Sequence, residues 1–225
     1  MRNTWLNTLF EISNKNKKII FIGSDLGFNV MANFKKKFPK RFFMEGISEQ
    51  NIVGTAAGMA LRGFIPYVNT IATFLTRRSF EQNVIDLGLH KLPVRLVGNG
   101  GGLVYGPLGP THQAIEDISI MTSIPNMSVF SVCDKNEMRQ LILQSQKWKG
   151  PMYIRLARGN EKIISQGKRF KIGEIVTFIK PEKYTIFSTG SLTQEALQSV
   201  KLLKMKGFNV GLIHVPSLKP INLNN

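Results

Sequence analysis

Apolar runs and helical patterns alternate along most of the chain. Runs typical of buried strands occur within 17–27, 41–48, 64–74, 92–102, 127–133 and 150–159. Between them, apolar residues recur at helical spacing within 49–63, 78–91, 114–124 and 135–148. Strands that alternate with helices at this spacing predict an α/β fold, in which a parallel sheet has helices on both faces.

The pattern changes after residue 160. Residues 161–182 are basic with scattered glycine and proline, which predicts a linker with a short hairpin. From residue 183 a strand, a helix and a second strand follow. We therefore expect a first domain at 1–160, the linker, and the start of a second α/β domain at 183–225. One such unit cannot bury both faces of its sheet. It therefore packs on another chain, or the sequence is a truncated version of a longer one.

Composition narrows the class of protein. The chain has 225 residues, with 30 Lys and Arg against 14 Asp and Glu, a formal charge of +16. No basic run is interleaved with stacking aromatic residues, so the charge indicates a lysine-rich solvated surface rather than a nucleic-acid site. An acidic protein partner is compatible with it.

Cysteine content and hydropathy suggest a cytoplasmic protein. Cys133 is the only cysteine, so no intrachain disulfide forms, which fits a reducing compartment. The first residues lack the apolar core of a signal peptide, and no apolar stretch reaches the ~18 residues that a membrane helix needs. We expect no membrane association.

The stretch EGISEQN at 45–51 has two interpretations. Glu49 falls in the first turn of a helix so rich in alanine and glycine that it must be buried on most sides. Glu49 is then simply a helix-capping acid, with Ser48 as the N-cap. Alternatively, Glu49 is a buried carboxylate that exchanges a proton or hydrogen bond with a ligand.

Other chemically capable residues also follow predicted strands. His112 comes after a Gly/Pro loop, where we expect the start of a helix, and Phe74 comes at the end of a strand. Ligands of open α/β sheets bind outside the carboxyl ends of the strands. A candidate site therefore combines five residues from this edge: Asp25, Glu49, Phe74, His112 and Arg158.

Several motifs in fixed order resemble a known family. RFFMEGISEQN, LPV, GPTHQAIED, IPNM and GPMYIRLARG are similar to the pyrimidine-binding domain of the transketolase family of thiamine-diphosphate enzymes, which includes deoxyxylulose-phosphate synthases. The resemblance covers about residues 17–160. STGSLTQEAL and SLKPIN, within 183–220, resemble the opening of that family's C-terminal domain.

The resemblance implies roles on the cofactor side. Glu49 matches the glutamate that hydrogen-bonds the pyrimidine ring of thiamine diphosphate and promotes its imino tautomer. Phe74 matches the aromatic residue that stacks on this ring. Asp25 matches an aspartate near the cofactor, and Arg78 aligns with the family arginine better than Arg77 does. The hard chemistry belongs to the cofactor, which the protein orients and tunes.

The substrate side matches less well. The resemblance makes His112 a group that contacts substrate and assists proton transfer, and Arg158 a substrate-phosphate ligand. Asn99 and Gly100, however, stand where relatives place His or Arg toward a phosphorylated substrate. Leu108 stands where an acid usually meets a substrate hydroxyl.

The resemblance implies a subunit of a larger enzyme. Relatives hold the diphosphate through Mg²⁺ on a separate domain with a GDG signature, which this sequence lacks. The expected partner is such a diphosphate-binding subunit, in a homodimer or heterotetramer, and no metal ligands are assigned to this chain. The expected reaction transfers a two-carbon ketol unit between sugars. Alternatives are a 2-oxo-acid decarboxylating synthase or dehydrogenase β-subunit, and a basic binding module that lost catalysis.

Overall fold

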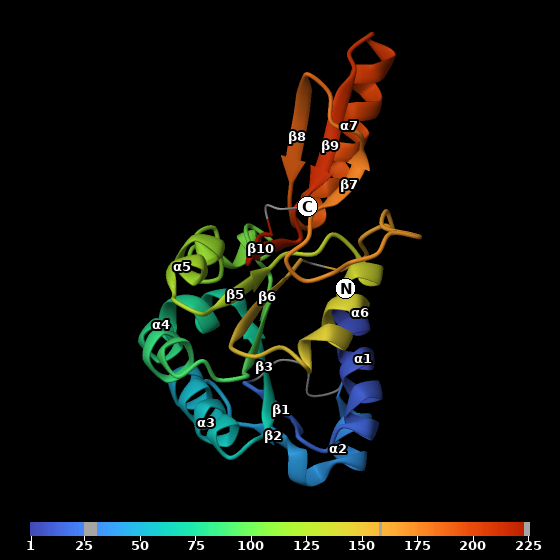
Figure 1. Cartoon of the computed structure of the whole chain (residues 1–225). Helices are drawn as coiled ribbons and strands as arrows, with labels where there is room; N and C mark the ends of the chain where they lie inside the picture. The colour runs from blue at the N-terminus through green and yellow to red at the C-terminus, as the bar shows by residue number, and fades with distance from the viewer. Residues whose placement is uncertain (25–30, 158, 223–225) are drawn as a thin grey trace.

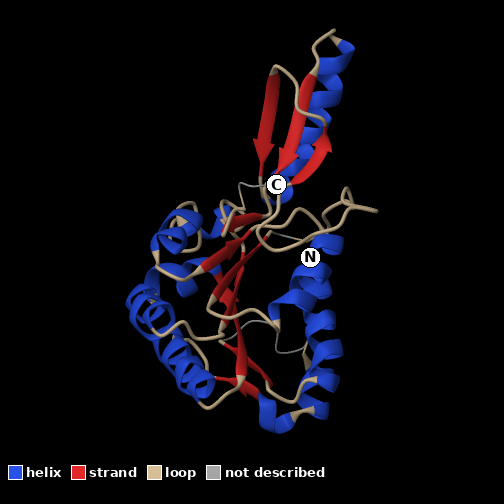
Figure 2. Ribbon diagram, in the orientation of Figure 1, coloured by secondary structure: helices blue, strands red, loops and turns tan. Residues whose placement is uncertain are grey.

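The computed structural model describes residues 1–24, 31–157 and 159–222. A seven-stranded sheet lies between two helical layers, and a smaller unit built around a three-stranded sheet extends from one end (Figure 1). The predicted α/β class, with a mainly parallel sheet covered on both faces, is confirmed (Figure 2). Among the described residues, no helix is both long and apolar enough to cross a membrane.

The large sheet has the strand order β10-β5-β6-β4-β3-β1-β2. All of its neighbouring strands are parallel except the pair β10 and β5. Its first six strands in chain order are β1 (Ile19–Gly23), β2 (Phe42–Met44), β3 (Ile65–Ile71), β4 (Arg95–Asn99), β5 (Ser128–Phe130) and β6 (Met152–Leu156).

Helices cover this sheet on both sides (Figure 1). One layer consists of α1 (Arg2–Lys15), α2 (Ala32–Lys37) and α6 (Lys135–Ser145). The other consists of α3 (Glu49–Leu61), α4 (Phe80–Gln82) and α5 (Asp117–Ser123), with the π-helical segments η2 (Phe74–Arg78) and η3 (Asn83–Leu89) on either side of α4 in the chain. The described part of this unit also contains the 3₁₀ turns η1 (Pro39–Arg41) and η4 (Gly106–Leu108).

Alternation along the strands creates two apolar cores. On β1, Phe21 joins the cluster that contains Trp5 of α1, whereas its neighbour Ile22 joins the cluster that contains Ile52 of α3. All five β1 residues are buried. Strands buried on both faces appear in sequence as continuous apolar runs, which is why the apolar runs predict the strands of this sheet.

The smaller unit has the strand order β7-β9-β8 and one helix. Its elements are β7 (Val176–Ile179), β8 (Tyr184–Ser188), η5 (Gly190–Leu192), α7 (Thr193–Met205) and β9 (Val210–His214). Val200 of α7 packs with Val210 and Leu212 of β9. Tyr184 and Phe187 on the edge strand β8 are 63% and 67% exposed.

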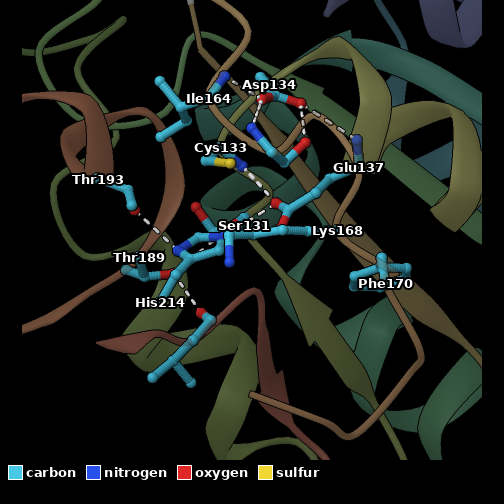
Figure 3. Close-up of polar contacts among 12 residues, drawn as sticks. Ser131, Cys133, Asp134, Glu137, Ile164, Lys168, Phe170, Thr189, Thr193 and His214 are labelled. Carbon is cyan, nitrogen blue, oxygen red and sulfur yellow. Dashed lines mark hydrogen bonds and ion pairs between the residues drawn. The ribbon is translucent and has the colours of Figure 1, made fainter. Parts of the chain in front are cut away.

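The two units are joined by more than the connecting chain. After β9, strand β10 (Ser217–Lys219) returns to the large sheet and pairs antiparallel with β5. The Gly190 amide donates to the Ser131 carbonyl at 2.8 Å. His214 at the end of β9 meets Glu137 of α6 in a buried polar junction (Figure 3).

The sequence did not predict α1, β7 or β10 as elements. The expected linker 161–182 contains β7, which pairs antiparallel with β9 and begins with the buried Val176. β10 falls inside the expected second domain yet extends the first sheet. The domain boundaries at residues 160 and 183 stay a prediction.

Candidate functional site

The carboxyl ends of β1, β2 and β3 converge on Glu49. Ser24 directly follows β1, Glu49 opens α3 shortly after β2, and Arg78 ends η2 after β3. The Ser24 hydroxyl donates to Glu49 Oε1 at 3.2 Å, and Arg78 Nη1 donates to Glu49 Oε2 at 2.5 Å. Three neighbouring strand ends therefore build one charged centre, at the edge where α/β sheets bind ligands.

Glu49 is completely buried, although it lies in the first turn of a helix. Ser48 occupies the N-cap position, but its hydroxyl donates to the Glu45 carbonyl and does not cap the helix. Burying a carboxylate costs free energy unless it is paired, and the only cation that pairs with Glu49 among the described residues is the 41% exposed Arg78. A surface capping acid would not need this arrangement, so the first interpretation does not account for Glu49.

Phe74 lies between a cation and an imidazole. The Arg78 guanidinium carbon is 4.2 Å from the centre of the Phe74 ring, in cation–π geometry. The His112 ring approaches Phe74 edge-on, with 5.3 Å between centroids and an interplanar angle of 68°. Three of the five residues of the candidate site, Glu49, Phe74 and His112, are therefore linked in the structure, with Arg78 in contact with both Glu49 and Phe74. Their roles stay a prediction. A surface hollow beside them is lined by Thr73, Phe74, Arg77, Arg78 and Thr111.

His112 reaches this position on a loop, not on a helix. We expected it at a helix N-terminus, which is wrong, because α5 begins only at Asp117. Ala114 forms bridges with Gly101 and Gly102 that prevent helical geometry there. The Thr111 hydroxyl lies 2.9 Å from His112 Nδ1 and fixes one side of the ring.

Asn99 lies at the end of β4 and is buried, with 3% of its surface exposed. Its amide nitrogen donates to the Thr70 carbonyl of the neighbouring strand at 3.1 Å. The side chain therefore ties β4 to β3, and its predicted contact with substrate stays a prediction.

A buried network behind the loop was not predicted from the sequence. Tyr153 and Arg155 of β6 both donate to Asp117 Oδ2, at 2.7 and 2.8 Å. Burial, reinforced by the Asp117 carboxylate, raises the pKa of Tyr153 well above its ordinary value, so its hydroxyl remains a donor. Gly101 passes so close that a Cβ there would be 2.3 Å from Arg155 Nε, which explains the glycine. In the sequence, only the repeated glycines after β4 indicate that the backbone passes this close to Arg155.

Two predicted site residues, Asp25 and Arg158, lie outside the described residues. The sequence also missed residues that the structure brings to the site. The only sequence signal for Ser24 is its place directly after a strand, and the family resemblance favours Arg78 over Arg77.

A group of possible metal ligands lies elsewhere in the described part of the chain. Ligand atoms of Cys133, Glu137 and His214 are within 4.8 Å of one another, and all three residues are buried. His214 Nε2 and Glu137 Oε2 already bond each other at 2.9 Å. Burial and the nearby carboxylates raise the pKa of the Cys133 thiol, which disfavours the thiolate that binds metals. The geometry favours a hydrogen-bonded junction.

Comparison with known proteins identifies this architecture. Residues 1–162 match the family described as transketolase, pyrimidine binding domain. A chain described as a transketolase C-terminal section from Methanocaldococcus jannaschii is 34% identical over 99% of this chain and 72% of its own length. An apulose-4-phosphate transketolase subunit from Phocaeicola vulgatus is 30% identical over 99% of this chain and 72% of its own length.

Other relatives carry a different activity in their names. The 1-deoxy-D-xylulose-5-phosphate synthase of Listeria monocytogenes is 34% identical over 96% of this chain, which corresponds to 36% of that protein. Among solved structures, a split-gene transketolase in an inactive β4 tetramer superimposes with a TM-score of 0.88 at 35% identity, over 98% of this chain and 72% of that one.

Proposed function

Because the chain belongs to the transketolase pyrimidine-binding domain family, we propose that it is the pyrimidine-binding subunit of a thiamine-diphosphate-dependent transferase that moves two-carbon ketol units. The observation that carries this proposal is the completely buried Glu49 carboxylate, which is joined through Arg78 to Phe74, whose ring in turn contacts His112. Named relatives include subunits of apulose-4-phosphate and 6-deoxy-6-sulfo-D-fructose transketolases, so split enzymes of this kind exist among them.

The residues present fit the pyrimidine half of the cofactor. Among the described residues, each Glu49 oxygen accepts one side-chain hydrogen bond and retains acceptor capacity, so the carboxylate can hold a pyrimidine nitrogen. Phe74 is half-buried and offers a stacking surface, although Arg78 covers one face of its ring. Thiamine diphosphate, when bound, supplies the carbon nucleophile that attacks a ketone.

The chain's own residues then supply proton handling and positioning. Glu49 holds a proton or hydrogen bond at the pyrimidine, and Arg78 keeps the carboxylate oriented from the solvent side. His112 contacts the Phe74 ring edge-on, where its imidazole can give or take a proton at a substrate oxygen. Arg158 and Asp25 stay proposed ligands of substrate phosphate and cofactor.

A partner subunit completes the site. The sequence has no GDG signature for the diphosphate and its Mg²⁺, so we propose that a separate chain carries both. A solved relative is an inactive assembly of β chains only, which supports the idea that the pyrimidine-binding chain requires such a partner for activity.

A second candidate reaction is decarboxylation of a 2-oxo acid followed by transfer. Its support is the 34% identity to a deoxyxylulose-phosphate synthase, equal to that of the transketolase section. The donor distinguishes them, since hydroxypyruvate serves ketol transfer and pyruvate serves the synthase reaction.

The test is reconstitution. The chain is purified alone and with a diphosphate-binding subunit, and each preparation is titrated with thiamine diphosphate and magnesium by calorimetry. We expect weak binding and no turnover for the chain alone, and tight binding with ketol transfer from hydroxypyruvate for the pair. Turnover by the chain alone would overturn the split arrangement, and turnover of the pair with pyruvate only would select the second reaction.

A further inference from the structure

The loop that carries His112 has few internal constraints. Its base is closed by two hydrogen bonds between Gly102 and Ala114, at 2.7 and 2.9 Å. Between them the backbone amides bond only within tight local turns, such as His112 N to Gly109 O at 3.0 Å. One side chain of the loop adds an internal contact, from Gln113 Nε2 to the Gly106 carbonyl at 3.3 Å. Pro107 and Pro110 have no N–H to donate. Something outside the loop must therefore hold His112 against Phe74.

Arg77 makes these external contacts on both sides of His112. Its Nη1 donates to the Pro110 carbonyl at 3.0 Å, and its Nη2 donates to the Gln113 carbonyl at 2.8 Å. The guanidinium also forms a two-point ion pair with Glu116, through Nε to Oε1 and through Nη2 to Oε2 at 2.8 Å. A planar fork of donors suits such multiple contacts, and a lysine cannot reproduce them.

The same helical turn positions Phe74 and Arg77. Both belong to η2, so the aromatic ring and the side chain that holds the His112 loop lie on one rigid element. Adjacent residues on a helix point in different directions. Arg77 consequently reaches the loop, while Arg78 reaches Glu49. Thr73 adds a weaker tie to the Thr111 carbonyl, at 3.2 Å.

We propose that Arg77 is a positioning residue that clasps the 110–116 loop and thereby fixes His112 beside Phe74. Its side chain is 40% exposed and that of Glu116 is 35% exposed, so the ion pair contributes little to global stability. Its effect is local. The consequence for catalysis rests on the proposed function, whereas the consequence for the position of His112 does not.

Proton NMR of the full chain tests the structural part. The chain has three histidines, so His112 is assigned by its loss in His112→Ala. In Arg77→Gln we expect the His112 ring resonances to shift, because the ring leaves its edge-on contact with Phe74, while those of His90 and His214 stay unchanged. Arg77→Lys should shift them as well, since it keeps the charge but loses the fork.

Arg139→Gln is the matched control. Arg139 of α6 forms a two-point pair with Glu11 of α1, at 2.7 and 3.1 Å, which is also exposed and lies in the helical layer opposite to η2 (Figure 1). It should leave the His112 resonances unchanged. Unchanged His112 resonances in Arg77→Gln, or an equal shift in Arg139→Gln, would overturn the proposal.

A double-mutant cycle in the reconstituted enzyme tests the catalytic part. Arg77→Gln should lower kcat by about ten- to a hundredfold with little change in KM, as expected for a misplaced catalytic group. In a His112→Ala background the same substitution should have almost no further effect. Additive losses would show that Arg77 does not act through His112. An inactive wild-type pair would instead count against the proposed function, and the NMR result would still decide the role of Arg77.

Discussion

His214, the last residue of β9, bonds Glu137 of α6 through Nε2 and Oε2 at 2.9 Å, with both side chains buried (Figure 3). The two residues belong to different units of the molecule. On its other side, His214 Nδ1 lies 2.8 Å from the Thr193 hydroxyl at the start of α7. Glu137 also accepts from the Cys133 amide at 2.9 Å. One imidazole thus links the small sheet, its helix and the large unit.

We predict that His214→Ala lowers the free energy of unfolding by about 1–3 kcal/mol, because it leaves the buried Glu137 carboxylate without one of its donors. His214→Gln keeps an amide donor and should lose less. Denaturant unfolding followed by circular dichroism measures both. His90→Ala is the control, since His90 is exposed, and it should leave stability unchanged. An equal loss in His90→Ala would contradict this role for the junction.

Cys133 should report opening of the same junction. The thiol is completely buried, and burial together with the Glu137 and Asp134 carboxylates raises its pKa. Both effects suppress reaction with thiol reagents. We expect slow labelling of the native chain at pH 8, and faster labelling of His214→Ala than of His90→Ala. Rapid labelling of the wild-type chain would show that the junction is open in solution.

Asp134 predicts an acid-sensitive contribution to stability. Its Oδ1 accepts from the Asn136 and Glu137 amides and the Ser165 hydroxyl, and its Oδ2 accepts from the Ile164 and Ser165 amides. Burial acts to raise the pKa of Asp134, but these hydrogen bonds outweigh it, and the pKa lies below its usual value. Stability from the ionised form is therefore complete above the unfolded pKa of about 4 and is lost as pH falls through the folded pKa.

The measurement is unfolding of the wild-type chain and Asp134→Asn across pH 7 to 3. At neutral pH we expect Asp134→Asn to be less stable by about 1–3 kcal/mol, because an amide accepts through one oxygen only. The difference in free energy of unfolding between the wild-type chain and Asp134→Asn should narrow below pH 4. Glu45→Gln, at an exposed position, should show no such narrowing. A difference that is constant with pH would exclude ionisation of Asp134 as its source.

The local pattern of apolar and polar residues predicts most of the large sheet and the helix α3. The continuous apolar runs identified the parallel strands, and the small-residue pattern of 49–63 identified α3 nearly to its ends. It missed α1, since buried Trp5 and Leu9 are diluted by polar residues, and β10, which is short and pairs with a distant strand. A strand of three residues, as β10 is, contains no local sequence signal for its pairing with β5.

The sequence predicts some residues of the candidate site but not its geometry. Glu49, Phe74 and His112 follow from strand ends and motif resemblance, and they lie together. The separate contacts of the two neighbouring arginines, one with the His112 loop and one with Glu49, do not follow from sequence spacing. Whether Arg77 or Arg78 reaches Glu49 depends on the π-helical geometry of η2, which spacing alone does not reveal.

Glu49→Gln should lower turnover of the reconstituted enzyme by about 10²–10⁴-fold, the usual effect of losing a positioned acid–base group. The fold should survive, because glutamine has nearly the same shape and can keep the contact with Ser24. Steady-state kinetics and circular dichroism check the two statements. Glu45→Gln is the matched control four residues earlier: Glu45 is exposed, and the substitution should retain near wild-type activity. Near wild-type turnover in Glu49→Gln would remove Glu49 from the mechanism.

The donor preference should reflect Leu108, which lies in the 3₁₀ turn of the His112 loop and is 57% exposed. The family resemblance leads us to expect an acid that meets a substrate hydroxyl at the position where this chain has Leu108. An apolar side chain cannot do so, and a substrate hydroxyl left unpaired once the partner subunit and cofactor enclose the site costs about 1–3 kcal/mol, equivalent to about a ten- to hundredfold change in rate constant. We therefore expect lower kcat/KM for xylulose 5-phosphate than for short unphosphorylated ketol donors. Leu108→Asp should raise the ratio toward the sugar phosphate, whereas Leu103→Asp, at a comparably exposed position of the same loop, should not. A wild-type preference for xylulose 5-phosphate would contradict the inference from Leu108, because the pocket would then satisfy the long donor without the acid.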